Sequence, residues 1–205
     1  MARPPQDPQI RINEILDAAE ALFYEHGYHP TMISDIVKKI GVAQGTFYYY
    51  FSSKEEVVDA LINRHLAKFK AAIDEVTNSA DISLSRKIEL MANIMLATIQ
   101  GKQGLLLEFL YNDRYLHLMD KVFRQAKKIL IPNLLSVIKE GKRKQIFAVS
   151  YPKAVANSIM SIIQCYIEAL YEKEAVDLLE YQNKLAKYLI KNALGLIKGD
   201  LQIPI

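Results

Sequence analysis

Residues 31–56 read TMISDIVKKIGVAQGTFYYYFSSKEE, and this stretch decides the fold of the N-terminal part of the chain. Gly41 predicts the end of a helix, because a residue without Cβ adopts the left-handed conformation at little cost. Thr31 is expected to cap the start of that helix. The stretch therefore predicts a helix, a tight turn and a second short helix. The apolar residues of the first helix recur at helical spacing: Ile33, Ile36, Val37 and Ile40.

The second helix combines an apolar face with a row of tyrosines. Phe47 and Phe51 lie four residues apart, so both can face the interior together. Tyr48, Tyr49 and Tyr50 stand between them, and so short a helix cannot bury all three rings. Several of these side chains must meet solvent or a binding partner. In a helix-turn-helix protein the second helix enters the DNA major groove, with its N-terminal residues at the base edges.

The polar groups of this second helix suit double-stranded DNA. Gln44 carries an amide that pairs bidentately with adenine, and Gly45 lets the backbone approach DNA closely. Thr46 and the hydroxyls of the three tyrosines are placed to reach phosphates. The N-terminal half of this helix is therefore the predicted base-reading element.

A further helix is predicted to begin at Lys54, because Ser53 and Glu56 have the spacing of a capping box. Lys54 then lies where free amides and the positive end of the helix favour a phosphate. Helical hairpins that bind no DNA show similar patterns, and three tyrosines in a row also suit packing or a plain surface. The neighbouring sequence decides between these interpretations.

Residues 10–56 resemble the N-terminal DNA-binding domain of the TetR family of bacterial transcriptional regulators. The matching pieces are ILDAAEALFYEHGY and TMISDIVKKIGVAQGTFYYYFSSKEEVV, which cover about a quarter of the chain. The resemblance implies a dimer that reads DNA and carries a separate inducer-binding domain. It implies base or phosphate contacts from the following residues: Gln44, Gly45, Thr46, Tyr48, Tyr49, Tyr50 and Lys54. Thr31 and Ser34 complete the predicted set of DNA-binding residues.

The chain departs from the family pattern at three positions. Ser34 stands where arginine is common, Ala43 where serine is common, and Gln44 where lysine often appears. The missing arginine removes a long charged contact from the helix before the turn. These departures concern the operator sequence rather than the mode of binding.

Composition favours a globular protein of the cytoplasm. The 205 residues are 51% hydrophobic, well above the disordered range. No apolar run reaches the roughly 18 residues of a membrane span, and MARPPQDPQ lacks the apolar core of a signal peptide. Cys165 is the one cysteine and has no internal disulfide partner. We therefore expect a cytoplasmic protein without a membrane partner.

The charge balance predicts weak non-specific attraction to DNA. The net charge is +3, and residues 1–55 hold five Lys or Arg against seven Asp or Glu. Few phosphates can then be neutralised, so affinity for random duplex is expected to be modest and to fall only shallowly with salt. Titrating salt against a random duplex measures that slope. A steep slope would contradict the expectation.

The rest of the chain is predicted to be helical, which gives an all-α protein. The first helix ends before Gly27, after an arm containing Pro4, Pro5 and Pro8. A DNA-binding domain is expected over residues 1–55, and a ligand-binding and dimerisation domain over residues 56–205. The later helices are expected at residues 54–76, 84–99 (broken by Gly101 and Gly104), 105–111, 115–140 (with Pro132 inside), 152–171 and 176–198.

The last two predicted helices are apolar on more than one face, so both faces must be buried. One face can pack on the domain core, and the other predicts a homodimer interface in the form of a four-helix bundle. A twofold dimer would read a palindromic operator. The residues assigned to this interface are Ile159, Ile163, Leu170, Leu185, Leu189, Ala193 and Leu196.

Methionine and aromatic side chains of the second domain are candidates for a pocket that binds an apolar or amphipathic small molecule. The same residue types also form ordinary cores. Glu108 and Glu168 interrupt apolar runs, and either can hold a cationic ligand or pair with a polar group of the protein. The candidate ligand-binding residues are Met91, Met95, Glu108, Phe109, Tyr111, Met119, Phe123, Met160, Gln164 and Tyr166.

Two other classes of function remain open at this stage. Asp113, His117 and Asp120 share one helix face, a spacing that suits either a metal-dependent enzyme or a solvated first turn. A helical ligand-binding or scaffolding dimer without DNA readout is the second alternative. The sequence has no Gly-rich phosphate loop, G-x-S-x-G or H-E-x-x-H motif. We therefore predict a non-enzymatic, ligand-responsive repressor without cofactor or metal.

Overall fold

A computed structural model of the chain describes residues 7–111, 116–172 and 174–196, with the side chains of residues 100–119 left out of the description. The described part is helical, apart from one isolated bridge between Phe147 and Leu196, so the predicted all-α class is confirmed. It divides into two compact units, Met1–His65 and Leu66–Ile205. No helix among the described residues is long and apolar enough to cross a membrane.

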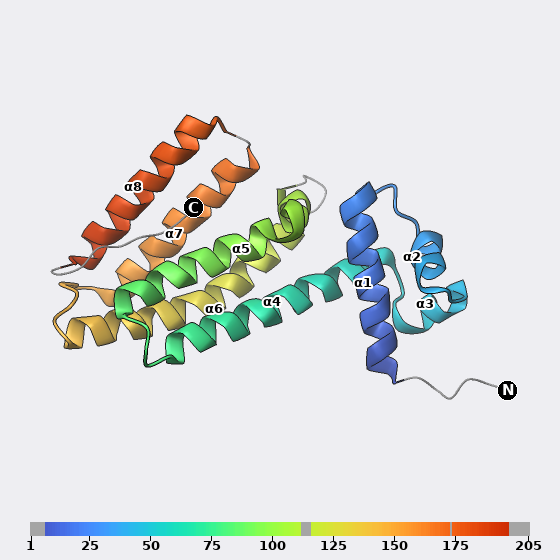
Figure 1. Cartoon of the computed structure of the whole chain (residues 1–205), viewed down its shortest axis with the longest axis horizontal. Helices are drawn as coiled ribbons and strands as arrows, with labels where there is room; N and C mark the ends of the chain where they lie inside the picture. The colour runs from blue at the N-terminus through green and yellow to red at the C-terminus, as the bar shows by residue number, and fades with distance from the viewer. Residues whose placement is uncertain (1–6, 112–115, 173, 197–205) are drawn as a thin grey trace. The chain divides into compact units, whose positions relative to one another are not determined.

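The first unit contains α1 (Pro8–His26), α2 (Ile33–Ile40), α3 (Gln44–Tyr50) and the beginning of α4 (Lys54–Asn78) (Figure 1). The unit ends after His65 rather than after residue 55, because the first turns of α4 contribute to its core. Apolar side chains from all four helices are buried there: Ile15, Leu16, Leu22, Phe23, Ile36, Val37, Phe47, Val57, Val58, Leu61 and Ile62.

Two predictions about helix starts in this unit were wrong. Pro8 belongs to α1 rather than to a preceding arm, since proline suits the first turn and Asp7 caps it by accepting from the amide of Gln9 at 2.9 Å. Residues 1–6, with Pro4 and Pro5, lie outside the described residues. Met32, not Thr31, precedes α2, and its amide donates to a carboxylate oxygen of Asp35 at 2.8 Å.

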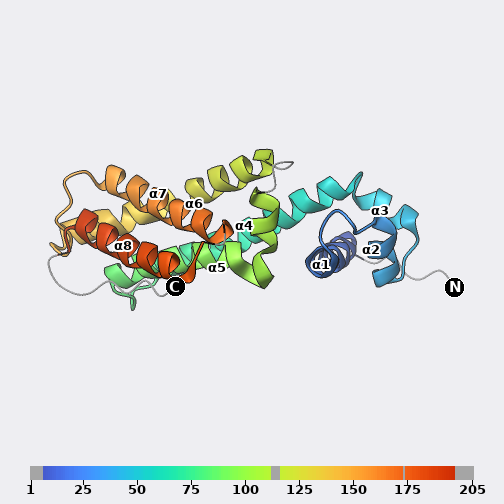
Figure 2. The same ribbon diagram turned by 90° about the horizontal axis from the view of Figure 1, so that it is seen from above.

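The second unit is a helical bundle formed by the rest of α4 with α5 (Leu84–Tyr111), α6 (Leu116–Arg143), α7 (Pro152–Tyr171) and α8 (Val176–Leu194) (Figure 2). Helix α5 packs on α6 and α7, α6 packs on α7, and α7 and α8 form a hairpin. Pro132 lies inside α6 as predicted. The interior is aliphatic, with Ile88, Met91, Leu130, Leu134 and Ile159 fully buried.

Two helix ends predicted from glycines in this unit were wrong. Helix α5 continues through Gly101 and Gly104, so the predicted break and separate helix at 105–111 are wrong. A helical glycine costs only about 1 kcal/mol relative to alanine, which a packed helix tolerates. Helix α8 ends at Leu194 rather than near residue 198, and Gly195, which follows it, has a left-handed φ of 53°.

The connection between α6 and α7 packs tightly against the end of α6. The ring of Phe147, which is 2% exposed, lies over Gly141, so that a Cβ at this glycine would be 2.0 Å from Cδ2 of the ring. The amide of Ala148 donates to the carbonyl of Gly195 at 3.1 Å, which ties this connection to the end of α8. The close approach at Gly141 requires a glycine.

Candidate nucleic-acid interface

The turn between α2 and α3 has the geometry predicted from the sequence. Gly41 is left-handed at φ 69° and ψ 38°, and its amide donates to the carbonyl of Lys38 at 3.2 Å. The amide of Val42 donates to the carbonyl of Val37 at 3.0 Å. These bonds satisfy the last carbonyls of α2 and turn the chain directly into α3.

Helix α3 buries its phenylalanines and exposes two of its tyrosines. Phe47 and Phe51 are 0% and 5% exposed, as their spacing predicts. Tyr48 and Tyr49 are 53% and 79% exposed, so these rings have no place in the core. Tyr50 is half-buried, and its ring meets that of Tyr49 edge to face at 4.8 Å. Two aromatic rings are therefore presented on the surface of the unit.

The predicted base-reading residues lie at the exposed N-terminal end of α3. Gln44 and Gly45 are exposed, and a Cβ at Gly45 would have no heavy atom within 4 Å. Gly45 does not have a positive φ, so neither backbone conformation nor internal packing requires a glycine there. Thr46 is half-buried, with its amide donating to the carbonyl of Ala43 at 2.9 Å. Ser34 is exposed on α2.

Thr31 is not available as a DNA contact in this structure. It is 2% exposed, and its hydroxyl donates to the carbonyls of Gly27 at 2.7 Å and Leu22 at 3.3 Å. These bonds attach the segment before α2 to the end of α1. The neighbouring Met32 is 66% exposed. The sequence analysis missed it, because it assigned the exposed, DNA-facing position to Thr31.

Lys54 is half-buried and binds backbone carbonyls of its own unit. Its ammonium donates to the carbonyls of Tyr28 at 2.7 Å, Thr31 at 2.7 Å and His29 at 3.4 Å. It also lies 4.1 Å from the centroid of the Tyr28 ring. Burial lowers the pKa of Lys54, against the opposing effect of Glu55. Because an ammonium has three donors, the phosphate contact predicted for Lys54 is replaced by a structural role.

The start of α4 forms its capping box with one change of partner. The Ser53 hydroxyl accepts from the amide of Glu56 at 3.2 Å, as predicted. The carboxylate of Glu56 reaches Ser52 instead of Ser53, accepting from its amide at 2.6 Å and its hydroxyl at 2.7 Å. Hydrogen bonds from Ser52 lower the pKa of Glu56. The pKa of Glu55 is lowered by a bond to its own amide and by the Tyr28 hydroxyl.

These two carboxylates predict a loss of stability in acid. Because their pKa values are lowered in the folded chain, the stability they contribute is present above the unfolded pKa of about 4.3 and is lost as pH falls through the folded values. Replacing Glu55 and Glu56 together by glutamine should flatten the decline of Tm below about pH 4.3. Melting curves recorded between pH 6 and pH 3 measure this, and parallel declines in wild type and variant would contradict it.

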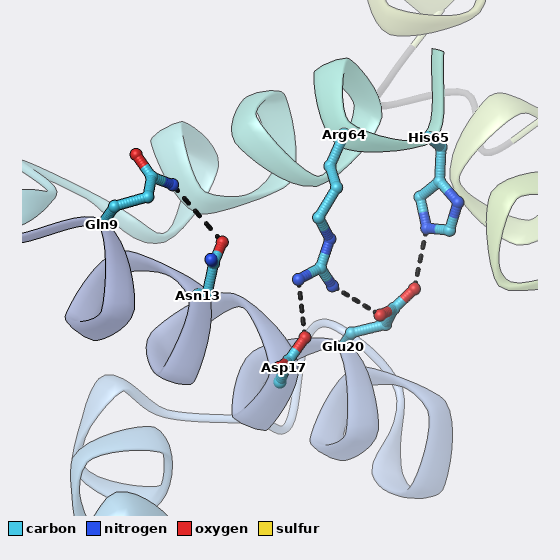
Figure 3. Close-up of polar contacts among 6 residues, drawn as sticks. All are labelled: Gln9, Asn13, Asp17, Glu20, Arg64 and His65. Atoms are coloured by element: carbon cyan, nitrogen blue, oxygen red, sulfur yellow. Dashed lines mark hydrogen bonds and ion pairs between the residues drawn. The ribbon is translucent and has the colours of Figure 1, made fainter. Parts of the chain in front are cut away.

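A polar cluster joins α1 to α4 (Figure 3). The carboxylate of Glu20, a residue that is 8% exposed, accepts from Nη2 of Arg64 at 2.6 Å and lies 2.7 Å from Nε2 of His65. Nη1 of Arg64 also donates to Asp17 at 2.6 Å. The sequence analysis missed this cluster, because its partners are more than 40 residues apart.

In the second unit the predicted ligand-binding residues are divided. Met91, Met95, Met160 and Tyr166 are buried, Phe123 and Gln164 are half-buried, and the side chains of Glu108, Phe109, Tyr111 and Met119 lie outside the described residues. Glu168 is exposed and accepts from Gln164 at 3.2 Å, which agrees with the alternative that it pairs with a polar group of the protein. Burial raises the pKa of Tyr166.

An apolar crevice opens between α7 and α8, with a volume of about 230 Å³. Among the described members of the predicted ligand set, Tyr166 alone lines it. Cys165, which is exposed, also lines it. The other lining residues are Ile162, Gln182, Leu185, Ala186 and Leu189.

The predicted dimer residues are also divided. Ile159 and Ile163 are 0% and 5% exposed, so they belong to the core of this unit and the prediction for them was wrong. Leu170, Ala193 and Leu196 are half-buried. Leu185 and Leu189 lie on an exposed apolar face of α8 that recurs at helical spacing, which we call the α8 face: Leu178, Tyr181, Leu185, Tyr188 and Leu189.

The metal site suggested by the spacing of Asp113, His117 and Asp120 finds no support. Asp113 and the side chain of His117 lie outside the described residues, and Asp120 pairs with Arg124 in the same helix at 2.7 Å. Among the side chains that are described, no three acidic, histidine or cysteine groups gather closely enough to hold a metal ion.

Residues 15–61 match the family described as bacterial regulatory proteins, tetR family. The resemblance of this segment to the TetR family, predicted from the sequence, is therefore confirmed. A fatty acid metabolism regulator protein of Bacillus subtilis is 39% identical over 62 residues, which are 30% of this chain and 32% of that protein. The transcriptional repressor KstR2 of Mycobacterium tuberculosis is 36% identical over 72 residues, which are 33% of this chain and 36% of that protein.

These matches span about a third of the length of the curated relatives. Both relatives are named as regulators, which agrees with the prediction that the chain is not an enzyme. The fold of the whole chain is shared more widely. A TetR transcription regulator from Haloarcula marismortui superposes with a TM-score of 0.73 at 22% identity, covering 90% of this chain and 98% of that one.

Proposed function

We propose that this protein is a cytoplasmic, ligand-responsive transcriptional repressor that binds a palindromic operator as a homodimer. One observation carries the proposal: α3 presents Gln44, Gly45, Tyr48 and Tyr49 on its exposed surface directly after a helix-turn-helix turn. Gln44 reads a base edge, and the tyrosines contact phosphates or thymine methyl groups. One of its relatives carries the name of a repressor.

The test is fluorescence anisotropy at fixed salt, with an operator selected by the protein from random duplex. We expect tight binding to the selected operator and weak binding to random duplex. Gln44→Ala should lose about tenfold or more in affinity for the operator, because a bidentate base contact contributes about 1–3 kcal/mol. Gln125→Ala, at an exposed glutamine of α6, is the matched control and should bind normally. If the selection enriches no duplex sequence, the result would favour the alternative function, a helical dimer that does not read DNA.

The α8 face supports the homodimer. Its five large apolar side chains are each at least 40% exposed, and an apolar stripe of this kind is commonly buried by a partner. Leu185→Glu should convert the dimer to a monomer and reduce operator affinity, while Lys184→Glu on the charged side of α8 should not. Sedimentation equilibrium measures the first effect. A Leu185→Glu protein that remains dimeric would place the interface elsewhere.

The inducer is proposed to be an apolar or amphipathic small molecule bound in the second unit. The buried methionines Met91, Met95 and Met160 support this, since thioether side chains adapt to ligands of varied shape. We call the first unit of each copy, Met1–His65, its reading head. Ligand binding would favour a state in which the two reading heads of the dimer are wrongly spaced for the operator. A long-chain fatty acid is the first probe to add to the anisotropy assay, because one relative regulates fatty acid metabolism. Release of operator by the probe would support this class of inducer.

A further inference from the structure

Glu20 is a charged residue in a place where charge is costly. It lies on the inner side of α1 and its side chain is 11% exposed, whereas the side chain of Asp17, one turn earlier, is 71% exposed. A buried carboxylate is tolerated only when it is paired and hydrogen-bonded. Glu20 meets this condition with two consecutive residues of α4, one for each of its oxygens.

The geometry of the pairing is specific. Oε2 of Glu20 accepts from Nη2 of Arg64 at 2.6 Å, and Oε1 lies 2.7 Å from Nε2 of His65, which must donate because a carboxylate only accepts. The second terminal nitrogen of Arg64 is bonded to Asp17 at 2.6 Å. Arg64 therefore spans two carboxylates that lie one turn apart on α1, with one terminal nitrogen of its planar guanidinium on each (Figure 3).

The cluster lies where the first unit ends along the chain, within α4. Arg64 and His65 are the last two residues of the first unit, and α4 continues as a single helix from Lys54 to Asn78. The cluster thus fixes α1 to α4 at the point where α4 leaves the DNA-reading unit. A change in the angle between α1 and α4 would require these bonds to break or to exchange partners.

We propose that Glu20 is a positioning residue: through Arg64 and His65 it sets the direction in which α4 leaves the reading head. In a twofold dimer that direction determines the spacing of the two heads. The inference rests on the proposed function, because spacing matters only if both heads engage one operator. The inference is that Glu20 affects how well two reading heads bind one operator together, in addition to any effect on the stability of a single head.

The experiment compares two duplexes of equal length, one with the full operator and one with a single half-site. Glu20→Gln keeps the shape of the side chain and removes its charge. We expect this variant to lose at least about tenfold in affinity for the full operator and less than about twofold for the half-site. Glu25→Gln, at an exposed glutamate of the same helix that pairs with its neighbour His26, is the control and should bind both duplexes normally. Arg64→Lys should give an intermediate loss on the full operator alone.

Equal losses on both duplexes would show that Glu20 merely holds the head together, and no loss on either would show that it does not position α4; both results overturn the inference. Hydrogen exchange of the same proteins without DNA supplies an independent reading. Faster exchange of α4 amides at residues 61–66 in Glu20→Gln than in Glu25→Gln supports the inference, and equal exchange overturns it. If the wild type prefers neither duplex over random DNA, the proposed function fails and the inference about head spacing fails with it, while the exchange result still shows whether Glu20 holds α4 to α1.

Discussion

Gly45→Ala is expected to make the free protein more stable and its operator binding weaker. Alanine favours a helix over glycine by up to about 1 kcal/mol, and the added methyl would enter open space. Gly45 has no positive φ, so nothing in the free chain accounts for a glycine at the exposed start of α3. A glycine there suits a surface that approaches the backbone closely, and the proposed DNA groove is such a surface.

Two measurements on one variant decide this prediction. Melting curves should show a Tm raised by a few degrees, consistent with a gain of up to about 1 kcal/mol in a small unit. Anisotropy with the selected operator should show a loss of about tenfold, equivalent to about 1.4 kcal/mol. A variant that gains stability and keeps full operator affinity would remove Gly45 from the interface.

Gly141→Ala should have the opposite effect on stability and a larger one. The new methyl would lie 2.0 Å from Cδ2 and 2.3 Å from Cε2 of the Phe147 ring, so the ring must leave its site. Overpacking usually costs about 1–3 kcal/mol, and displacement of a buried phenylalanine raises the cost further. After the gain in helix propensity, we expect a net loss of about 2–4 kcal/mol in the free energy of unfolding.

The control for Gly141→Ala lies in the same two residues. Phe147→Leu alone should be destabilising, because it leaves part of a fully enclosed site empty. Added to Gly141→Ala, it should cost less than the sum of the two single losses, since the smaller side chain makes room for the methyl. Denaturant titrations of the four proteins give the coupling. Additive losses would mean that the ring and the glycine do not act on one another.

Periodicity predicted the reading head well, because its information is local. The spacing of apolar residues in α2, the turn at Gly41 and the inward pair Phe47 and Phe51 are all determined by neighbours within one or two helical turns. The same reasoning failed at Gly101, where it assigned a helix break. Packing over the length of α5 outweighs the intrinsic cost of one glycine, and no local pattern reports that packing.

The roles of polar residues were harder to predict, because they depend on partners far away in the sequence. Thr31 and Lys54 were expected at the surface, yet both are occupied by backbone carbonyls of the segment that follows α1. The sequence around Glu20 does not indicate its role, because Arg64 and His65 contact it only when α1 and α4 have packed together. The α8 face, in contrast, has a period that was present in the sequence and was assigned only in part.

The start of α4 has a consequence for the cell in which the protein works. The ammonium of Lys54 is bonded to the chain itself, and the carboxylate of Glu56 occupies the amide of Ser52. A unit that bound DNA mainly through the proposed hydroxyl, amide and aromatic contacts would displace few counterions. We therefore expect the affinity of the proposed operator complex to change little when the potassium concentration rises, as in an osmotically stressed cell, whereas a complex that depends on lysine and arginine would weaken.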